Sequence, residues 1–399
     1  MGNSLTLVRV FGIEMRVHWS FLLIVVYYAF LYSGAGTSPL LGAAFGIVIL
    51  LLLFVCVTLH ELGHALVAKY YKINVPTITL LPIGGVAALE RMPDKPLQEF
   101  LIAIAGPLVN IAIAAILTPF AAFAVAAAIN AGEPLTSAAA IWRFAQMPGL
   151  GNLVVNLVMV NVALALFNLL PAFPMDGGRI LRALLAMAMP YVQATRIAVV
   201  VGRLMAVLFA IWGIMGGGIF LLLIAFFVYV GGGAELEAVE SRTVLRNITA
   251  QRALTPAAAS LYASERVNRA VDLIMSSYQT DYPVLDLASR FVGVLTRQRL
   301  VQALKEHGPD ARIVDVMIPA EKVPVASLRD TLDSLWEKMA LTGSRVVAVK
   351  EDQEFRGLIT RDDIPEISAV VGASQENASQ NPPADATKGD AGMRGAVDA

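Results

Sequence analysis

The sequence predicts an α-helical polytopic membrane protein of about six transmembrane helices, with a short membrane-associated β element, followed by a small α/β domain. Hydrophobic residues make up 57% of the 399 positions, charged residues only 15%, and the mean hydropathy is +0.67. A soluble domain of this length is not expected to reach these values. Six apolar runs are long enough to span a bilayer, at about residues 18–34, 40–70, 97–129, 151–170, 197–214 and 216–232.

The positive charges between these runs predict the orientation of the chain. Twelve lysines and arginines flank the runs on one side, whereas the loops of the other side hold Arg143 alone. Cytoplasmic loops carry the excess of Lys and Arg, so both termini are expected in the cytoplasm and the protein in the cell (plasma) membrane. The net charge of −1 gives no indication of a nucleic-acid partner.

Two of the four histidines, His60 and His64, lie inside the second apolar run, with Glu61 next to the first of them. Side chains four residues apart share one face of a helix, so both imidazoles can bind one metal ion while Glu61 accepts a proton from water. Ionisable side chains are costly in a bilayer unless they are paired or bind a metal. The motif therefore predicts a hydrolytic metal site within the membrane.

A hydrolytic zinc site usually takes three protein ligands and leaves one position for water, so a third ligand is expected on the same side of the membrane. Asp176 is the candidate, because it follows the fourth run in a segment where Pro171 and Pro174 break the helix. It is taken as the only carboxylate besides Glu61 near a membrane segment. A helix cap or turn residue is the alternative interpretation of Asp176.

These residues belong to four motifs that together resemble the site-2 proteases, the zinc metalloproteases of regulated intramembrane proteolysis. The motifs are residues 60–64, 81–85, 106–110 and 168–178, and the resemblance covers roughly residues 5–235. It implies one zinc on His60, His64 and Asp176, Glu61 as general base, and Asn168 near the substrate or the developing oxyanion. A hydrogen bond between helices is an equally good interpretation of Asn168 and of Asn110.

The segment from Asn74 to Glu90 mixes apolar residues with Pro, Thr and Gly, which predicts short strands or a hairpin. A transmembrane helix must be unwound and held extended before it can be cut, and an edge strand could hold it in this way. We expect that edge here, with a connecting re-entrant loop as the alternative. Residues 5–17 are expected to add strands to the same sheet.

An internal repeat follows residue 240. Residues 291–297 match residues 355–361 at an offset of 64, in a pattern that resembles a tandem pair of CBS domains at about residues 244–305 and 313–367. The resemblance implies binding of ATP, ADP or AMP by Thr360 and Asp363 in the second copy. Arg299 replaces the matching Asp of the first copy, so at most one site is expected. Dimerisation or docking without a ligand is the alternative.

We therefore expect residues 1–240 to form a zinc endopeptidase that cuts transmembrane helices of membrane-protein substrates near their cytoplasmic end. Residues 241–370 are expected to regulate it or to join it into a homodimer, and residues 371–399 to form a disordered tail of small and polar residues. A catalytically silent scaffold would have lost a ligand or the base, and neither is lost. A transporter gated by the CBS pair would carry charged or broken helices throughout, whereas here the ionisable residues cluster.

Overall fold

The computed structural model describes residues 4–35, 38–81, 84–88, 93, 95–254, 259–277, 279–352, 354–368 and 370–371. The chain divides into two compact units, Met1–Val239 and Glu240–Ala399. The expected disordered tail lies outside the described residues apart from residue 371, as do residues 82–83 of the second motif.

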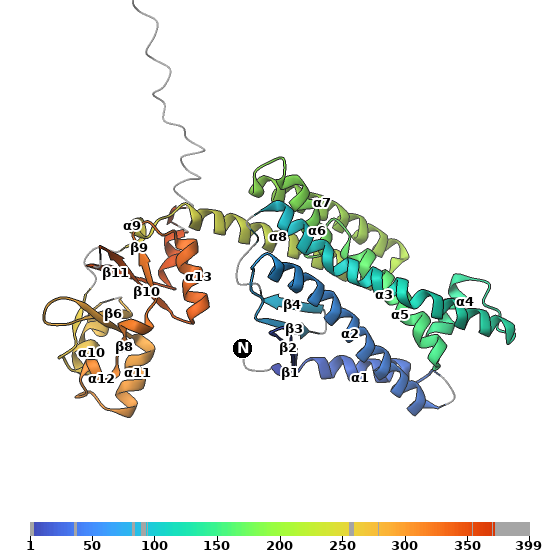
Figure 1. Ribbon diagram of the computed structural model, residues 1–399, viewed down its shortest axis with the longest axis horizontal. Coiled ribbons are helices and arrows are strands. Elements are labelled where there is room, and N and C mark those ends of the chain that lie inside the picture. The colour runs from blue at the N-terminus through green and yellow to red at the C-terminus, as the bar shows by residue number, and fades with distance from the viewer. Residues whose placement is uncertain are drawn as a thin grey trace, which may run out of the picture. The chain divides into compact units, whose positions relative to one another are not determined.

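Among the described residues, five helices are long and apolar enough to cross a membrane, and they correspond to five of the six predicted runs (Figure 1). They are α2 (Pro39–Tyr70), α3 (Pro96–Asn130), α5 (Leu150–Asn168), α7 (Tyr191–Trp212) and α8 (Ile219–Arg246). A π-helical segment, Gly213–Gly217, follows α7 directly. The shorter helices α4 (Ala138–Ala145) and α6 (Asp176–Ala186) precede and follow α5.

The starts of α2 and α3 follow from their sequences. The Ser38 hydroxyl accepts a hydrogen bond from the Leu41 amide and so caps α2. Pro39 and Pro96 occupy the first turns of α2 and α3, where the missing proline N–H leaves no hydrogen bond unmade.

The first apolar run, predicted as a transmembrane helix over residues 18–34, forms a shorter helix. Helix α1 covers only Phe21–Tyr32, 12 residues, or about 18 Å, against a hydrocarbon core of about 30 Å. The chain enters α1 directly from strand β2 (Ile13–His18), which packs beside α2. A strand followed by a short helix therefore takes the place of a complete transmembrane helix.

Strand β2 belongs to a four-stranded sheet in the order β1-β2-β3-β4. The other strands are β1 (Ser4–Val10), β3 (Thr77–Leu81) and β4 (Gly84–Ala88), and only the β2–β3 pair is parallel. The predicted strands in the segment after α2 are thus confirmed, and so is the addition of residues 5–17 to their sheet. Strand β4 forms one edge of the sheet.

The sheet packs along the last turns of α2. Alternate strand residues, Ile13, Met15, Ile78 and Leu80, form one buried cluster with Ala65 and Ala68 of α2. At one end of the sheet the Lys69 ammonium donates to the Phe11 carbonyl, at 2.6 Å. At the other end Leu80 pairs with Gly85. This packing brings the Gly85 end of β4 to the turn of α2 that holds Glu61, against which Gly85 lies.

The second unit has the α/β architecture that the sequence predicts for its repeat. One sheet has the order β5-β6-β7-β8 and the other β11-β10-β9. The strands are β5 (Leu261–Tyr262), β6 (Asp281–Leu285), β7 (Phe291–Thr296), β8 (Ile318–Pro319), β9 (Val325–Ser327), β10 (Val346–Glu351) and β11 (Glu354–Thr360). The helices are α9 (Ala250–Ala253), α10 (Val267–Ser276), α11 (Arg297–Glu306), α12 (Ile313–Val316) and α13 (Leu332–Thr342), with a 3-10 turn at Ala320–Lys322.

The two copies of the repeat pack against each other through equivalent residues. Phe291 and Phe355, which are 64 positions apart, stack with ring centroids 4.5 Å apart. Val294 of the first copy shares a buried cluster with Val346 and Ala348 of the second. The internal repeat of the sequence is therefore also a repeat of structure.

Candidate metal centre

Three potential metal ligands converge where α2 meets the start of α6. The Nε2 atoms of His60 and His64 are 3.1 Å apart, and each lies 3.2 Å from Oδ2 of Asp176. His60 and Asp176 are buried, and His64 is nearly so. The structure thus brings together the three residues that the sequence analysis singles out as metal ligands, although 112 positions separate His64 from Asp176 in the chain.

Helix α3 orients both imidazole rings. Nδ1 of His60 lies 2.9 Å from Oδ1 of Asn110, and Nδ1 of His64 lies 2.6 Å from the backbone carbonyl of Ile102. Both oxygens accept hydrogen bonds, so each Nδ1 carries the ring hydrogen and each Nε2 keeps a free electron pair. Such outer partners commonly fix the tautomer of metal-binding histidines.

This arrangement fits a cation better than it fits hydrogen bonding. With both Nε2 atoms unprotonated, no hydrogen lies between them and Asp176, whose Oδ2 is buried without a hydrogen-bond partner. Ligand atoms held at 2.0–2.1 Å by a tetrahedral zinc ion lie about 3.3 Å from one another, close to the separations found here. Two imidazoles and a carboxylate are also a donor set that zinc accepts.

Two glycines allow α2 and α3 to approach closely at the metal centre. A Cβ on Gly106 would overlap the rings of His64 and His60. A Cβ on Gly63 would lie 2.8 Å from Cγ2 of Val109, nearer than carbon atoms pack. The Gly and Asn of the 106–110 motif therefore have separate physical roles, since Gly106 makes room for the rings and Asn110 orients one of them.

The loop before Asp176 fixes the position of this residue, and three glycines pack closely on the loop. A Cβ on Gly177 would overlap the Leu170 carbonyl, and one on Gly178 would lie 2.7 Å from the backbone of Ala172. The same loop is contacted by Gly231 of α8, where a Cβ would lie 2.8 Å from Cδ of Pro174. The two glycines after Asp176 are thus required because backbone packs directly on backbone there.

Glu61 lies beside the metal centre, against the edge strand. It is not one of the three converging ligands, and its side chain packs on the backbone of Gly85 in β4 so closely that a Cβ on Gly85 would overlap it. Among the described residues, strand β4 pairs with β3 alone. The carboxylate of Glu61 thus lies next to the cluster of potential metal ligands and against one face of β4.

The asparagines behave differently from one another. Asn110 makes the hydrogen bond between helices that the sequence analysis gives as an alternative, and its partner is His60. Asn168 donates its side-chain amide to the Leu164 carbonyl of its own helix, at 3.0 Å. The structure therefore places Asn168 at the end of α5 without joining it to the cluster of ligands.

The statement that Asp176 and Glu61 are the only carboxylates near a membrane segment is wrong. Glu99 lies inside the predicted run 97–129, where the structure buries it at the start of α3, and Glu235 lies inside α8. Both pair with Arg182. This arginine is one of the twelve positive charges from which the orientation is predicted, but it is buried. The sequence does contain a signal for this pair, because an isolated charged residue such as Glu99 within an apolar run is expected to have a buried partner.

In the second unit, Thr360 and Asp363 hydrogen bond to each other's backbone. Asp363 accepts from the Thr360 amide at 2.7 Å, and Thr360 Oγ1 accepts from the Asp363 amide at 3.3 Å, as in a capping box. In the first copy, Thr296 caps α11 by accepting from the Arg299 amide, at 3.2 Å. The Arg299 guanidinium donates to the Val316 carbonyl.

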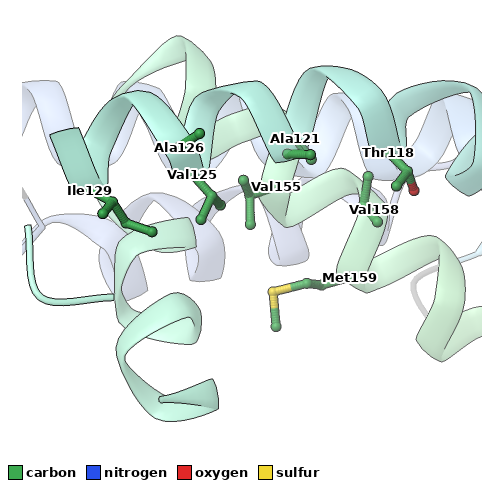
Figure 2. A pocket seen from close by; sticks show the side chains of 9 residues that line it. Thr118, Ala121, Val125, Ala126, Ile129, Val155, Val158 and Met159 are labelled. Atoms are coloured by element: carbon green, nitrogen blue, oxygen red, sulfur yellow. The ribbon is translucent and has the colours of Figure 1, made fainter. Parts of the chain in front are cut away.

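A pocket of about 400 Å³ lies between α3 and α5 and is lined by none of the potential metal ligands. Figure 2 shows the side chains that line it. Its only polar side chain, that of Thr118, donates to the Ala114 carbonyl of its own helix. Without a charged group the cavity is not a candidate catalytic site. Its lining residues are Thr118, Ala121, Ala122, Val125, Ala126, Ile129, Val155, Val158 and Met159.

Comparisons with known proteins agree with this geometry. Residues 48–212 match peptidase family M50. A zinc metalloprotease of Methanocaldococcus jannaschii is 33% identical over 376 residues, which cover 94% of this chain and 99% of that protein.

Two solved structures are also similar to parts of the chain. The site-2 protease from Methanocaldococcus jannaschii covers 59% of this chain and 95% of its own, at 35% identity and a TM-score of 0.42. The CBS domains of a transcriptional regulator from Streptococcus pneumoniae cover 30% of this chain and 98% of their own, at 21% identity and a TM-score of 0.27.

Proposed function

Because the chain belongs to peptidase family M50, the zinc metalloproteases of the site-2 protease type, we propose that it cuts transmembrane helices of membrane proteins near their cytoplasmic end. The observation that carries the proposal is the convergence of His60, His64 and Asp176 beside Glu61. Lys69, at the end of α2, is one of the positive charges that assign this end to the cytoplasm. His64 is five residues from it, about 7 Å along the helix.

The proposed chemistry assigns a separate task to each residue. His60, His64 and Asp176 hold the zinc ion, which when bound supplies polarisation of a water molecule and of the scissile carbonyl. Glu61 accepts the proton of the attacking water and then donates it to the leaving amine. Asn168 is proposed to contact the substrate or the developing oxyanion from the end of α5.

Substrate is proposed to bind as an extended strand on β4. This strand is at the edge of the sheet in the part of the chain that the structure describes, and its residue Gly85 lies directly against Glu61. A peptide that adds to the sheet edge satisfies the backbone groups that unwinding exposes within the membrane. Strand addition would therefore bring an unwound bond to the catalytic base. A purely connecting role for the β3–β4 hairpin is the alternative.

The second unit is proposed to regulate or dimerise the protease. Support for a nucleotide is limited to the sequence pattern at Thr360 and Asp363, which also serves as a helix cap. Within this unit, Arg242 and Arg246 of the last turns of α8 both bind Asp333 at 2.9 Å. We propose at most one adenine-nucleotide site per chain and a homodimer formed through this unit, with docking or dimerisation without a ligand as the alternative.

The remaining assignments are proposals of the same kind. The protease part is proposed to comprise residues 1–240 and the CBS pair residues 241–370, with residues 371–399 as a disordered tail. Both termini are proposed to lie in the cytoplasm and the protein in the cell (plasma) membrane. The excess of Lys and Arg on one side of the helices supports this orientation.

Co-expression with a candidate substrate tests the proposal. Wild-type protein should cut the substrate within its transmembrane helix, near the cytoplasmic end, at a bond located by mass spectrometry. The Glu61→Gln variant, expressed at the same level, should leave the substrate intact. Equal cutting by both would remove Glu61 from the chemistry, and binding without cutting by the wild type would favour the scaffold.

A further inference from the structure

Arg182, Glu99 and Glu235 form a buried cluster of charged side chains, and Arg182 lies on the same helix as Asp176. The arginine lies on α6, six residues after Asp176, and only 1% of the residue is exposed. Its Nε and Nη2 donate to Oε1 of Glu99 at 2.8 and 2.5 Å, and its Nη1 donates to Glu235 at 2.6 Å. The guanidinium also lies over the ring of Phe173, 4.9 Å from its centroid.

Such a cluster is a poor source of stability. Removing charges from solvent costs several kcal/mol per ion, and apolar residues of similar volume often replace a buried ion pair without loss. A buried ion pair does, however, fix the relative position of two elements, because its planar donors accept only a narrow geometry. Its position in the molecule is therefore the informative feature.

Helix α3 contacts both helices that carry the potential ligands, namely α2 with the two histidines and α6 with Asp176. Ile102 and Asn110 of this helix orient His64 and His60. Glu99 lies three residues before Ile102, on the same face of the helix. The Arg182–Glu99 pair thus ties the helix of the third ligand to the helix that orients the first two. Glu235, by contrast, ties Arg182 to α8, which packs on Pro174 of the loop before Asp176 but makes none of the contacts to the histidines described above.

We propose that Arg182 is a positioning residue of the metal centre, which fixes Asp176 relative to His60 and His64 through Glu99. Arg182 also contacts the loop that precedes Asp176, because the ring of Phe173 packs against the same guanidinium. The arginine therefore contributes to the position of Asp176 through this loop as well. The inference rests on the proposed zinc site. It assigns different tasks to the two carboxylates. Glu99 links the arginine to α3, the helix that contacts both histidines, whereas Glu235 links it to α8, which contacts neither of them among the interactions described above.

The two carboxylates provide a matched pair of variants. Glu99→Gln and Glu235→Gln each remove one negative charge from the same guanidinium with almost no change of volume. Purified full-length protein in lipid nanodiscs is loaded with Zn²⁺, and the rate of zinc release to a chelator is measured. Glu99→Gln should release zinc several-fold faster than wild type. The change should be smaller than the roughly tenfold or greater effect of losing a direct hydrogen-bond partner of a ligand, because Glu99 acts through Arg182. Glu235→Gln should release zinc at the wild-type rate.

A second readout separates positioning from a general loss of structure. In Co²⁺-loaded protein the visible absorption bands report the geometry of the ligands, and they should shift in Glu99→Gln but not in Glu235→Gln. Arg182→Lys, which keeps the charge but lacks the planar fork, should resemble Glu99→Gln and decides the question if Glu99→Gln does not fold. Equal zinc release by both glutamine variants, or wild-type release and spectrum in Arg182→Lys, would overturn the proposal.

Asp176→Ala separates this inference from the proposed function. If Asp176→Ala keeps its zinc, the assignment of the metal centre itself is wrong and the positioning role falls with it. If Asp176→Ala loses zinc while Glu99→Gln and Arg182→Lys behave as wild type, only the positioning role is wrong.

Discussion

Gly106 of α3 lies directly against His64 of α2, and a Cβ at this position would overlap the imidazole. The Gly106→Ala variant should therefore displace the ring, reduce bound zinc and abolish most of the cleavage activity. Elemental analysis of the purified variant measures the loss. Gly34→Ala is the control, because a Cβ on Gly34 meets no atom within 4 Å. Full zinc in Gly106→Ala would show that the helices can separate without cost.

Asn110 should act through His60 rather than on the substrate. Its Oδ1 fixes the His60 tautomer, so Asn110→Leu should weaken zinc binding by about tenfold or more. Asn110→Asp keeps an acceptor oxygen and should retain most of the metal. Competition with a chelator measures both, and Asn152→Leu, which removes a hydrogen bond to the Phe144 carbonyl, is the control. Unchanged affinity in Asn110→Leu would contradict this role.

Substitution of a metal ligand should remove zinc, whereas substitution of the general base should remove only the cleavage activity. Asp176→Ala and His60→Ala should lose most of the one zinc ion expected per chain, because each removes an electron-pair donor. Glu61→Gln should keep the zinc and lose cleavage, since a general base is not a ligand. Zinc content and cleavage are measured on the same preparations. A Glu61→Gln protein without zinc would move Glu61 into the coordination sphere.

The CBS pair should bind at most one adenine nucleotide strongly per chain. Equilibrium dialysis of the full-length protein with labelled ATP, ADP or AMP should show this site, and Asp363→Ala should remove it together with any effect of nucleotide on cleavage. Because Asp363 also caps a helix, Thr296→Ala is the control, which removes the corresponding cap of α11. Absence of binding at millimolar nucleotide would leave dimerisation or docking as the function.

The sequence predicts those parts of the site that local spacing encodes. The four-residue interval between His60 and His64 places both rings on one helix face whatever the surrounding fold is. The broken helix before Asp176 is visible for the same reason. Glu99 and Arg182, in contrast, are separated by 83 positions, and no local pattern relates them. The carbonyl of Ile102 carries no side-chain signal at all, because any residue supplies one.

The first crossing shows a similar limit for the fold. Residues 18–34 have the apolar length of a transmembrane helix, and hydropathy alone cannot show where the helix begins within such a run. The helix starts only at Phe21 because His18 still belongs to β2, a strand whose residues 14–17 pair with β3 and which packs on α2. That pairing joins segments about 60 positions apart and depends on tertiary contacts.

Zinc K-edge X-ray absorption on purified protein tests most directly whether His60, His64 and Asp176 form the metal centre. We expect one zinc per chain with nitrogen and oxygen ligands at about 2.0–2.1 Å, including two imidazoles, and the same spectrum in Glu61→Gln. Cys56 lies one turn before His60 on α2 and is the nearby alternative donor. A sulfur ligand at about 2.3 Å, or a changed spectrum in Glu61→Gln, would show that His60, His64 and Asp176 are not the three protein ligands.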